Sequence, residues 1–412
     1  MDAINSGDTA FLLVATALVM LMTPGLALFY GGMVRSKNVM SVIMQSFVLI
    51  GLVSIVWAVI GYTLAFGPDR GGLIGSLQYV FLRGVGQAPN PDYAATIPHL
   101  VFMMFQGMFA VITPALITGA FAERMKFSAF LLFSLLWTLL VYSPTAHWVW
   151  GVGGWIRELG ALDFAGGTVV HISSAVAALA AVLVIGRRRG HGTVPMHPHN
   201  LPMTLLGAGI LWFGWFGFNA GSALTAGVLA ANAFVTTHLA AAAAALSWGL
   251  AEWMHRGQPT SLGVASGLVA GLVAITPAAG FVGPMSAIVI GLIAGSLCYL
   301  GVLAKWKLGY DDSLDVVGVH GVGGTFGAIA TGLFAQAAIN SAGANGAFFG
   351  NPALLAKQIV AVVAIMAWSF GITYGLVSLV KVLMGARVDE EAEMLGLDLS
   401  QHSEGAYAFG TE

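Results

Sequence analysis

Charged side chains are scarce in this sequence. Only 8% of its 412 residues are Asp, Glu, Lys or Arg, and the formal net charge at pH 7 is −2. Proteins that bind nucleic acid carry a basic surface, so this balance argues against a nucleic-acid partner. Cysteine is nearly absent as well, because Cys298 stands alone in an apolar run. A single cysteine offers neither a disulfide framework nor a thiolate metal site.

Apolar residues, in contrast, are abundant. They make up 58% of the chain, more than a water-soluble protein could bury. About 20 apolar helical residues cross the roughly 30 Å of bilayer hydrocarbon, and the 55 glycines indicate close helix packing. We therefore predict an all-α polytopic membrane protein with eleven transmembrane helices, near residues 8–33, 40–66, 97–121, 127–147, 165–186, 201–220, 226–253, 260–279, 284–304, 315–336 and 352–384.

Basic residues predict the orientation of these spans. With the N-terminus outside, only Arg70, Arg83, Arg157 and Lys357 fall on outer loops. The inner side then carries twelve, as the positive-inside rule requires: Arg35, Lys37, Arg124, Lys126, Arg187, Arg188, Arg189, Arg256, Lys305, Lys307, Lys381 and Arg387. Asp2 and Asp8 precede the first span where a signal peptide would be basic, so we expect a retained helix. We predict one transmembrane domain over residues 1–386 and a cytoplasmic regulatory tail over residues 387–412.

Two histidines lie in predicted spans that run in opposite directions. Asp163 precedes His171 by eight residues, and Asp312 precedes His320 by the same interval. This repetition predicts two inverted five-helix repeats with the eleventh helix added. If the eight residues were helical, each histidine would lie about 12 Å below its own surface, and the two would meet near the middle of the membrane. Ionisable groups are costly there, so the pair is a candidate functional site.

Other interpretations of these residues remain open. A single buried histidine is more often satisfied by a backbone carbonyl, and two histidines could hold a heme or a metal, since imidazole is a common ligand. No third Cys, Asp or Glu ligand stands close by in the helical turns, so we expect no cofactor and no metal site. An aspartate before a helix usually accepts its first N–H groups. We assign that role to Asp312 and leave the role of Asp163 open.

Four segments carry a resemblance to a known family. They are "GLALFYGGMVRSKN" at 25–38, "DFAGGTVVH" at 163–171, "GWFGFNAGSA" at 214–223 and "DVVGVHGVGG" at 315–324. In sequence and order they resemble the ammonium transporter (Amt/Rh) family, in its bacterial ammonium channel branch. The resemblance implies a homotrimer in the cytoplasmic membrane, with one pore through each eleven-helix subunit. It also implies transport of ammonium or ammonia, with methylammonium as an analogue, and no enzyme activity.

The resemblance also implies roles for particular residues. Phe105, Phe109, Trp150 and Ser222 correspond to the outer ammonium-binding site, and Phe109 with Phe218 corresponds to a stacked gate. His171 and His320 correspond to the twin histidines of the pore, and Asp163 to an aspartate near the recruitment site with a partly structural role. Pro114 departs from the family pattern. Because proline can kink a helix, it puts the placement of Phe109 in question.

The chemistry of ammonium suggests how such a site would work. Aromatic faces attract a cation by about 0.5 to 2 kcal/mol, whereas carrying a charge to the bilayer centre costs about 3 to more than 10 kcal/mol. We expect ammonium to be bound outside, to lose its proton on desolvation, and to pass the histidines as neutral ammonia. Histidine can relay protons, which favours net charge movement over a purely neutral flux; both remain open.

The polar tail suggests regulation. Its composition alone is typical of a disordered end, but its resemblance to the family's ordered tail predicts packing across a neighbouring subunit and closure by a PII-type signalling protein. Membrane lipids are the remaining expected partner. An ammonium sensor and a twin-histidine redox or metal protein remain alternatives. A potassium channel is disfavoured because the TVGYG filter sequence is absent.

Overall fold

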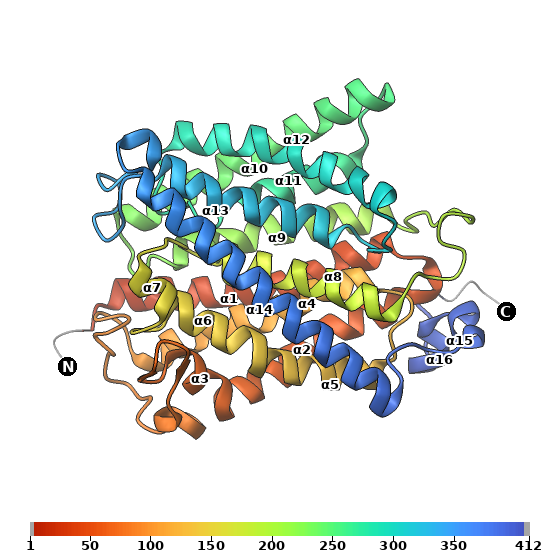
Figure 1. Cartoon of the computed structure of the whole chain (residues 1–412), viewed down its shortest axis with the longest axis horizontal. Coiled ribbons are helices and arrows are strands. Elements are labelled where there is room, and N and C mark those ends of the chain that lie inside the picture. Colours follow the sequence, from red (N-terminus) through yellow and green to blue (C-terminus); the bar gives the residue numbers. More distant parts are fainter. Residues whose placement is uncertain (1–3, 408–412) are drawn as a thin grey trace.

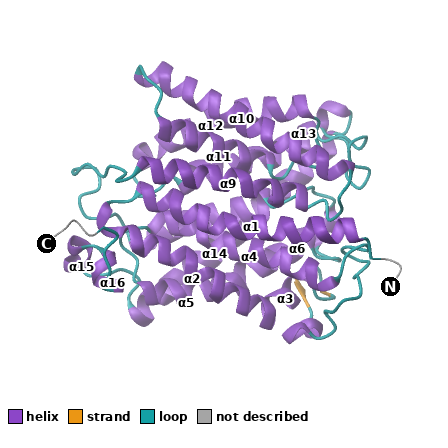
Figure 2. Cartoon of the chain, turned by 180° about the vertical axis from the view of Figure 1, so that it is seen from behind, coloured by secondary structure: helices purple, strands orange, loops and turns teal. Residues whose placement is uncertain are grey.

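The computed structural model describes residues 4–407, so Asp2 and the last five residues of the predicted tail lie outside the described part. Its helices lie nearly side by side, with the two chain ends at opposite ends of the bundle (Figure 1). We call these ends the N-terminal face and the tail face. Figure 2 shows the same arrangement from behind, with the few strand residues confined to the N-terminal face near α3.

The elements follow one another in a simple order. The α-helices are α1 (Ser6–Met33), α2 (Val39–Val56), α3 (Tyr62–Phe66), α4 (His99–Phe121), α5 (Phe127–Trp137), α6 (Ser143–Trp150), α7 (Trp155–Leu159), α8 (Ser173–Ile185), α9 (Leu201–Gly221), α10 (Val228–Arg256), α11 (Ser261–Ile275), α12 (Pro284–Leu308), α13 (Val322–Phe334), α14 (Pro352–Met384), α15 (Glu390–Leu395) and α16 (Leu397–His402). Short 3-10 helices are η1 (Ser36–Asn38), η3 (Leu77–Leu82) and η7 (Ala347–Phe349). Wider π turns are η2 (Trp57–Gly61), η4 (Thr138–Tyr142), η5 (Gly167–Ile172) and η6 (Val317–Gly321). Strands β1 (Asp69–Arg70) and β2 (Ile74–Gly75) pair antiparallel, with Asp69 opposite Gly75.

The all-α membrane fold predicted from the sequence is confirmed. Among the described residues, ten helices are long and apolar enough to cross a membrane. The eleventh expected span, residues 260–279, is represented by α11, an apolar helix of only 15 residues followed by turns. Helix length and hydropathy therefore do not confirm the count of eleven.

Two halves of the chain pack against each other through their first helices. Helices α1 to α8 form one side of the bundle and α9 to α13 the other, while the long α14 runs diagonally across them (Figure 1). Helix α1 packs along α9, and a Cβ atom added to Gly207 of α9 would lie 2.2 Å from the backbone nitrogen of Phe29. Only glycine permits so close an approach, as is typical of helix pairs within membranes.

The described part of the tail is ordered and packs on its own chain. The Asp398 carboxylate accepts a hydrogen bond from the backbone N–H of Ser41, 2.8 Å away, at the start of α2. The backbone N–H of Leu397 donates to the side-chain oxygen of Asn38, and Lys37 donates to the carbonyl oxygen of Glu393. These contacts fix α15 and α16 at the tail face.

The glycine contacts give a test of the packing. A Cβ atom at Gly291 of α12 would lie 2.3 Å from the carbonyl oxygen of Ala240 on α10, whereas nothing lies within 4 Å of one at Gly375 of α14. We expect Gly291→Ala to destabilise the protein by about 1 to 3 kcal/mol through overpacking. Gly375→Ala should be neutral or stabilising by up to about 1 kcal/mol, because alanine favours helix. Thermal unfolding of the purified variants measures both; equal stabilities would contradict this packing.

Candidate functional site

Four hollows follow one another from the N-terminal face to the tail face. The first, of about 250 Å³, is lined by Trp150 and Ser222. The second, of about 10 Å³, is lined by both candidate histidines and has room for about one molecule of the size of water. The third, of about 30 Å³, shares His320 with the second. It also shares Asp315 with the fourth, a mouth of about 770 Å³ at the tail face.

The first hollow brings together most of the predicted outer site. Phe109, Trp150, Asp163 and Ser222 all line it. The indole N–H of Trp150 donates to the backbone oxygen of Asp163 at 3.0 Å, and its ring meets the Phe109 ring edge-on at 6.0 Å between centroids. Phe105 is placed differently. It is fully buried and packs edge-on against Phe109, so it supports the wall from behind.

Two aromatic rings separate the first hollow from the second. Phe109 lines the former and Phe218 the latter, and their rings are stacked with centroids 4.1 Å apart. Pro114 leaves this arrangement undisturbed, because α4 continues through it as one helix from His99 to Phe121. The Thr113 hydroxyl donates to the carbonyl oxygen of Phe109 at 2.6 Å, which fixes the turn that precedes the proline.

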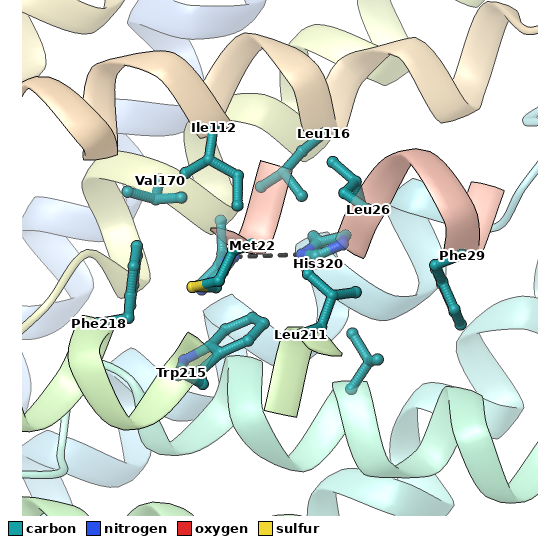
Figure 3. Close-up of a pocket in the computed structure, with 12 residues that line it drawn as sticks. Met22, Leu26, Phe29, Ile112, Leu116, Val170, Leu211, Trp215, Phe218 and His320 are labelled. Carbon is teal, nitrogen blue, oxygen red and sulfur yellow. Dashed lines mark hydrogen bonds between the residues drawn. The ribbon is translucent and has the colours of Figure 1, made fainter. Parts of the chain in front are cut away.

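The two histidines meet in the second hollow. Their Nδ1 atoms are 3.2 Å apart, and their rings are nearly parallel, with centroids separated by 5.3 Å. Trp215 also stacks on His171, with ring centroids 5.4 Å apart. Figure 3 shows aliphatic side chains such as Leu26 and Leu211 around His320. Within the described residues that line this hollow, no carboxylate is present, so the imidazoles are its main polar groups.

Each histidine lies on a π turn close to the start of its helix. The interval of eight residues is only partly helical, because η5 begins at Gly167 and η6 at Val317. The prediction of an eight-residue helical descent of about 12 Å is therefore wrong. The rings meet because both helices start within the protein, at segments where Ala165 and Asp312 are buried. Irregular backbone at this depth is tolerated where it lines a cavity, and π turns are frequent at functional sites.

Carboxylates hold the free N–H groups at both helix starts. Asp163 accepts from the backbone of Gly166, Gly167 and Thr168 at 2.7 to 2.8 Å, and from the Thr168 hydroxyl. Asp312 accepts from the backbone N–H of Val317 at 2.7 Å. Both therefore act as helix caps, and for Asp163 this observation favours the structural role that the sequence left open.

A network of buried charges surrounds the mouth at the tail face. Arg188 pairs with Asp311 at 2.8 Å and with Glu123 at 3.4 Å. Burial by itself would raise the pKa of Asp311, but hydrogen bonds and the charges of Arg188 and Arg124 lower it well below its usual range. For Asp312 burial prevails: it raises the pKa to about 6, against the opposing charge of Lys305. Asp312 is thus close to neutral at mildly acid pH, whereas Asp311 stays ionised.

Two lining residues were missed by the sequence analysis. The amide oxygen of Gln106 is buried without a hydrogen-bond partner among the described residues, and Gln106 lines the first hollow. Trp215 covers one face of His171. Signals for both existed, because a glutamine inside an apolar span is unusual and Trp215 precedes Phe218 by three residues on the same helix face. Groups of three or more His, Cys, Asp or Glu residues placed to hold a metal ion are absent from the described part of the chain.

This architecture defines a class: a helical membrane protein whose two halves enclose a narrow passage interrupted by paired aromatic rings and paired imidazoles. The model of the Ammonium Transporter Family matches residues 10–407. An ammonium transporter of Bacillus subtilis (strain 168) is 58% identical over 402 residues, covering 97% of this chain and 98% of that protein. The chain belongs to the ammonium transporter family.

Solved structures give the same answer at the level of the fold. Mep2 of Candida albicans superposes with a TM-score of 0.90 at 36% identity, covering 98% of this chain and 91% of that one. A structure described as "Sensor Amt Protein" superposes with a TM-score of 0.89 at 31% identity, covering 96% and 98%. The resemblance stated from the four sequence segments is thereby confirmed.

The raised pKa of Asp312 gives a stability test. Because its folded-state pKa lies above 3.8, the ordinary value for an aspartate in water, the folded protein holds the proton more tightly than the unfolded chain. Stability should therefore fall as the pH rises from about 4 to 6. Asp312→Asn cannot ionise, yet its amide oxygen can still accept from Val317. We expect this variant to unfold at a higher temperature than the parent at pH 7.5 and at the same temperature near pH 3.5, below the pKa of the carboxyl in both states.

The control for this test is Glu391→Gln, which neutralises an exposed carboxylate of the tail. It should leave the unfolding temperature unchanged at both values of pH. A gain for Asp312→Asn that is as large at pH 3.5 as at pH 7.5 would contradict the assignment.

Proposed function

We propose that this chain is a membrane channel for ammonium that passes the substrate as neutral ammonia. Ammonium binds in the first hollow, loses a proton at the Phe109 and Phe218 rings, and continues past His171 and His320. The observation that carries this proposal is the second hollow, which has room for about one small molecule and is lined by apolar side chains and two imidazoles. A bare cation would meet no carboxylate there to offset its lost hydration.

The first hollow has the groups that recruitment of ammonium needs. The faces of Trp150 and Phe109 can attract a cation, with Phe105 supporting Phe109 from behind. The Ser222 hydroxyl donates its hydrogen to the carbonyl oxygen of Phe218 at 2.8 Å, so its oxygen can accept a hydrogen bond from ammonium. Asp163 contributes by holding the start of η5 and by its negative charge beside this hollow.

The phenylalanine rings and the imidazoles have different roles: the rings remove water from the substrate, and the imidazoles accept the proton. Removing water from ammonium lowers its pKa, because burial disfavours the charged form, and the stacked rings exclude water from the second hollow. The Nδ1 atoms of the two histidines, 3.2 Å apart, can share a proton. We infer that this pair relays the released proton, so that transport carries net charge. Neutral flux of ammonia, with the proton returned outside, is the alternative.

Several features extend the proposal to the whole protein. We assign residues 1–386 to the channel and residues 387–412 to a cytoplasmic regulatory tail. The chain spans the cytoplasmic membrane with its N-terminal face on the outer side. We assign it no enzyme activity. We also propose a homotrimer in which a neighbouring subunit packs on α9 and α10, where His238 is exposed and stacks on Trp212. An ionisable group about ten residues into a membrane helix is costly against lipid, and a neighbouring subunit would cover it.

Uptake of labelled methylammonium into vesicles tests the transport route. Replacing both His171 and His320 by alanine should lower the rate on the order of tenfold or more, which corresponds to about 1.4 kcal/mol or more of added barrier. Ser222→Ala should instead raise the half-saturating concentration by about tenfold, because a hydrogen bond to a charged group contributes about 1.5 to 3 kcal/mol. Transient currents recorded on the parent should follow ammonium addition.

Opposite outcomes are informative. Undiminished uptake by the double histidine variant would exclude the proposed route, and parent uptake without current would establish neutral flux. An ammonium sensor is the second candidate, favoured by the similarity to the structure described as "Sensor Amt Protein". Negligible uptake by the folded parent would support that role instead.

Regulation by a PII-type protein is tested by its binding to the tail face. The Asp398 carboxylate fixes the tail to the start of α2, so Asp398→Ala should loosen the tail and weaken association several-fold in a pull-down. Glu404→Ala, which removes an exposed carboxylate from the same tail, is the matched control and should bind like the parent. Absence of association with a cognate PII protein under every nucleotide condition would end this part of the proposal.

A further inference from the structure

A fifth hollow lies outside the passage, beneath the diagonal helix α14. It has a volume of about 840 Å³ and is enclosed by α8, α12, α13 with its preceding π turn, and α14. Helix α14 contacts α8, where the Ser369 hydroxyl donates to the carbonyl oxygen of Ser173 at 2.6 Å. Because α14 crosses its neighbours at an angle (Figure 1), a wedge of space opens beside this contact.

The walls of this groove are apolar and open to the lipid side of α14. Its larger lining side chains are Leu179, Leu297, Phe326, Met366 and Phe370, and among the described lining residues Thr325 alone carries a hydroxyl. Val363 stands at the rim with 59% of its surface exposed. The groove is thus continuous with the apolar surface that α14 presents as a membrane span.

Water cannot fill this groove. A buried water molecule needs two to four polar partners, and an apolar cavity of about 150 Å³ already stays dry and takes an apolar guest. An empty space of 840 Å³ would leave its walls without contacts on one side, and that lost dispersion energy is destabilising. In a membrane the surrounding medium is itself hydrocarbon, so a flexible lipid chain is the available guest.

We propose that the groove is a binding site for one acyl chain of a membrane lipid. Its walls belong to the helices that carry the histidines. Val317 and Gly321 of the π turn that contains His320 line the groove, and so does Ala175, four residues after His171. The bound chain therefore packs against the outer side of the same backbone whose inner side presents the paired imidazoles. It is a fixed part of the wall around the passage.

Two glycines of α14 make this site testable. A Cβ atom at Gly371 or at Gly375 would have no other atom within 4 Å, and both residues are exposed on the same helix. Only Gly371 lines the groove. Gly371→Trp therefore introduces an indole at the groove from a position where its Cβ atom meets no other atom, and Gly375→Trp is its matched control.

The experiment uses the full chain in vesicles that contain phosphatidylcholine with a photoreactive diazirine in the middle of one acyl chain. After irradiation, labelled peptides are located by mass spectrometry. We expect labelling of Phe326, Met366 and Phe370 in several-fold excess over the exposed Leu379 of α14. Gly371→Trp should lower the groove labelling several-fold, and Gly375→Trp should leave it unchanged.

Other results would overturn the proposal. Labelling no stronger in the groove than at Leu379, an equal effect of the two tryptophan variants, or cross-links from the groove to a second copy of the chain would each do so. If Gly371→Trp does not fold, Gly371→Leu fills less of the groove and serves in its place. The labelling pattern of the parent decides the question independently of any variant, and none of these readouts depends on transport.

Discussion

The contact between two imidazoles organises this molecule. His171 and His320 come from the two halves of the chain, and their nitrogens lie 3.2 Å apart in a space with room for about one water. For the rings to meet there, both helices must begin inside the protein rather than at its surface. A helix that begins inside exposes free N–H groups to an apolar environment, and each unpaired group is costly. The carboxylates of Asp163 and Asp312 satisfy those groups, so the caps and the imidazole pair form one structural unit.

Small residues make the rest of the arrangement possible. Without a hydrophobic driving force between helices in lipid, close packing and hydrogen bonds hold the bundle together. Gly207 lets α9 approach the backbone of α1, and Gly327 of α13 lets that helix approach the carbonyl oxygen of Ala274. The first contact joins the two halves, and the second packs α13 against α11 within one of them. Thr237 extends the same logic to polar groups, because it accepts the amide of Asn219 across α9 and α10.

The sequence predicted much of this fold for physical reasons. Long apolar stretches, the distribution of basic residues and the repeated spacing of aspartate and histidine suffice for a polytopic helical protein with a symmetrical pair at its centre. The prediction that the eight residues before each histidine are helical was wrong. Each aspartate caps its helix from a loop, and the sequence does not reveal how deep in the protein that loop lies. Phe105 was expected in the outer site and lies behind its wall. Nearly every position of α4 is buried. The apolar periodicity of such a helix therefore does not predict which side chains point into the hollow. Gln106 of α4 was missed for the same reason, whereas Trp215 of α9 was overlooked although it precedes Phe218 by three residues on the same helix face.

The cap of α2 has a consequence for how the chain is made. The carboxylate that holds the first turn of this helix belongs to Asp398, 357 residues further along the sequence. During synthesis the second membrane helix therefore leaves the ribosome and enters the bilayer with that end uncapped, and it remains uncapped until residue 398 has been translated. Synthesis of the segment around residue 398 and closure of the contacts at the tail face are thus coupled. A chain that ended before residue 398 would keep its membrane helices but would leave the first turn of α2 without this cap.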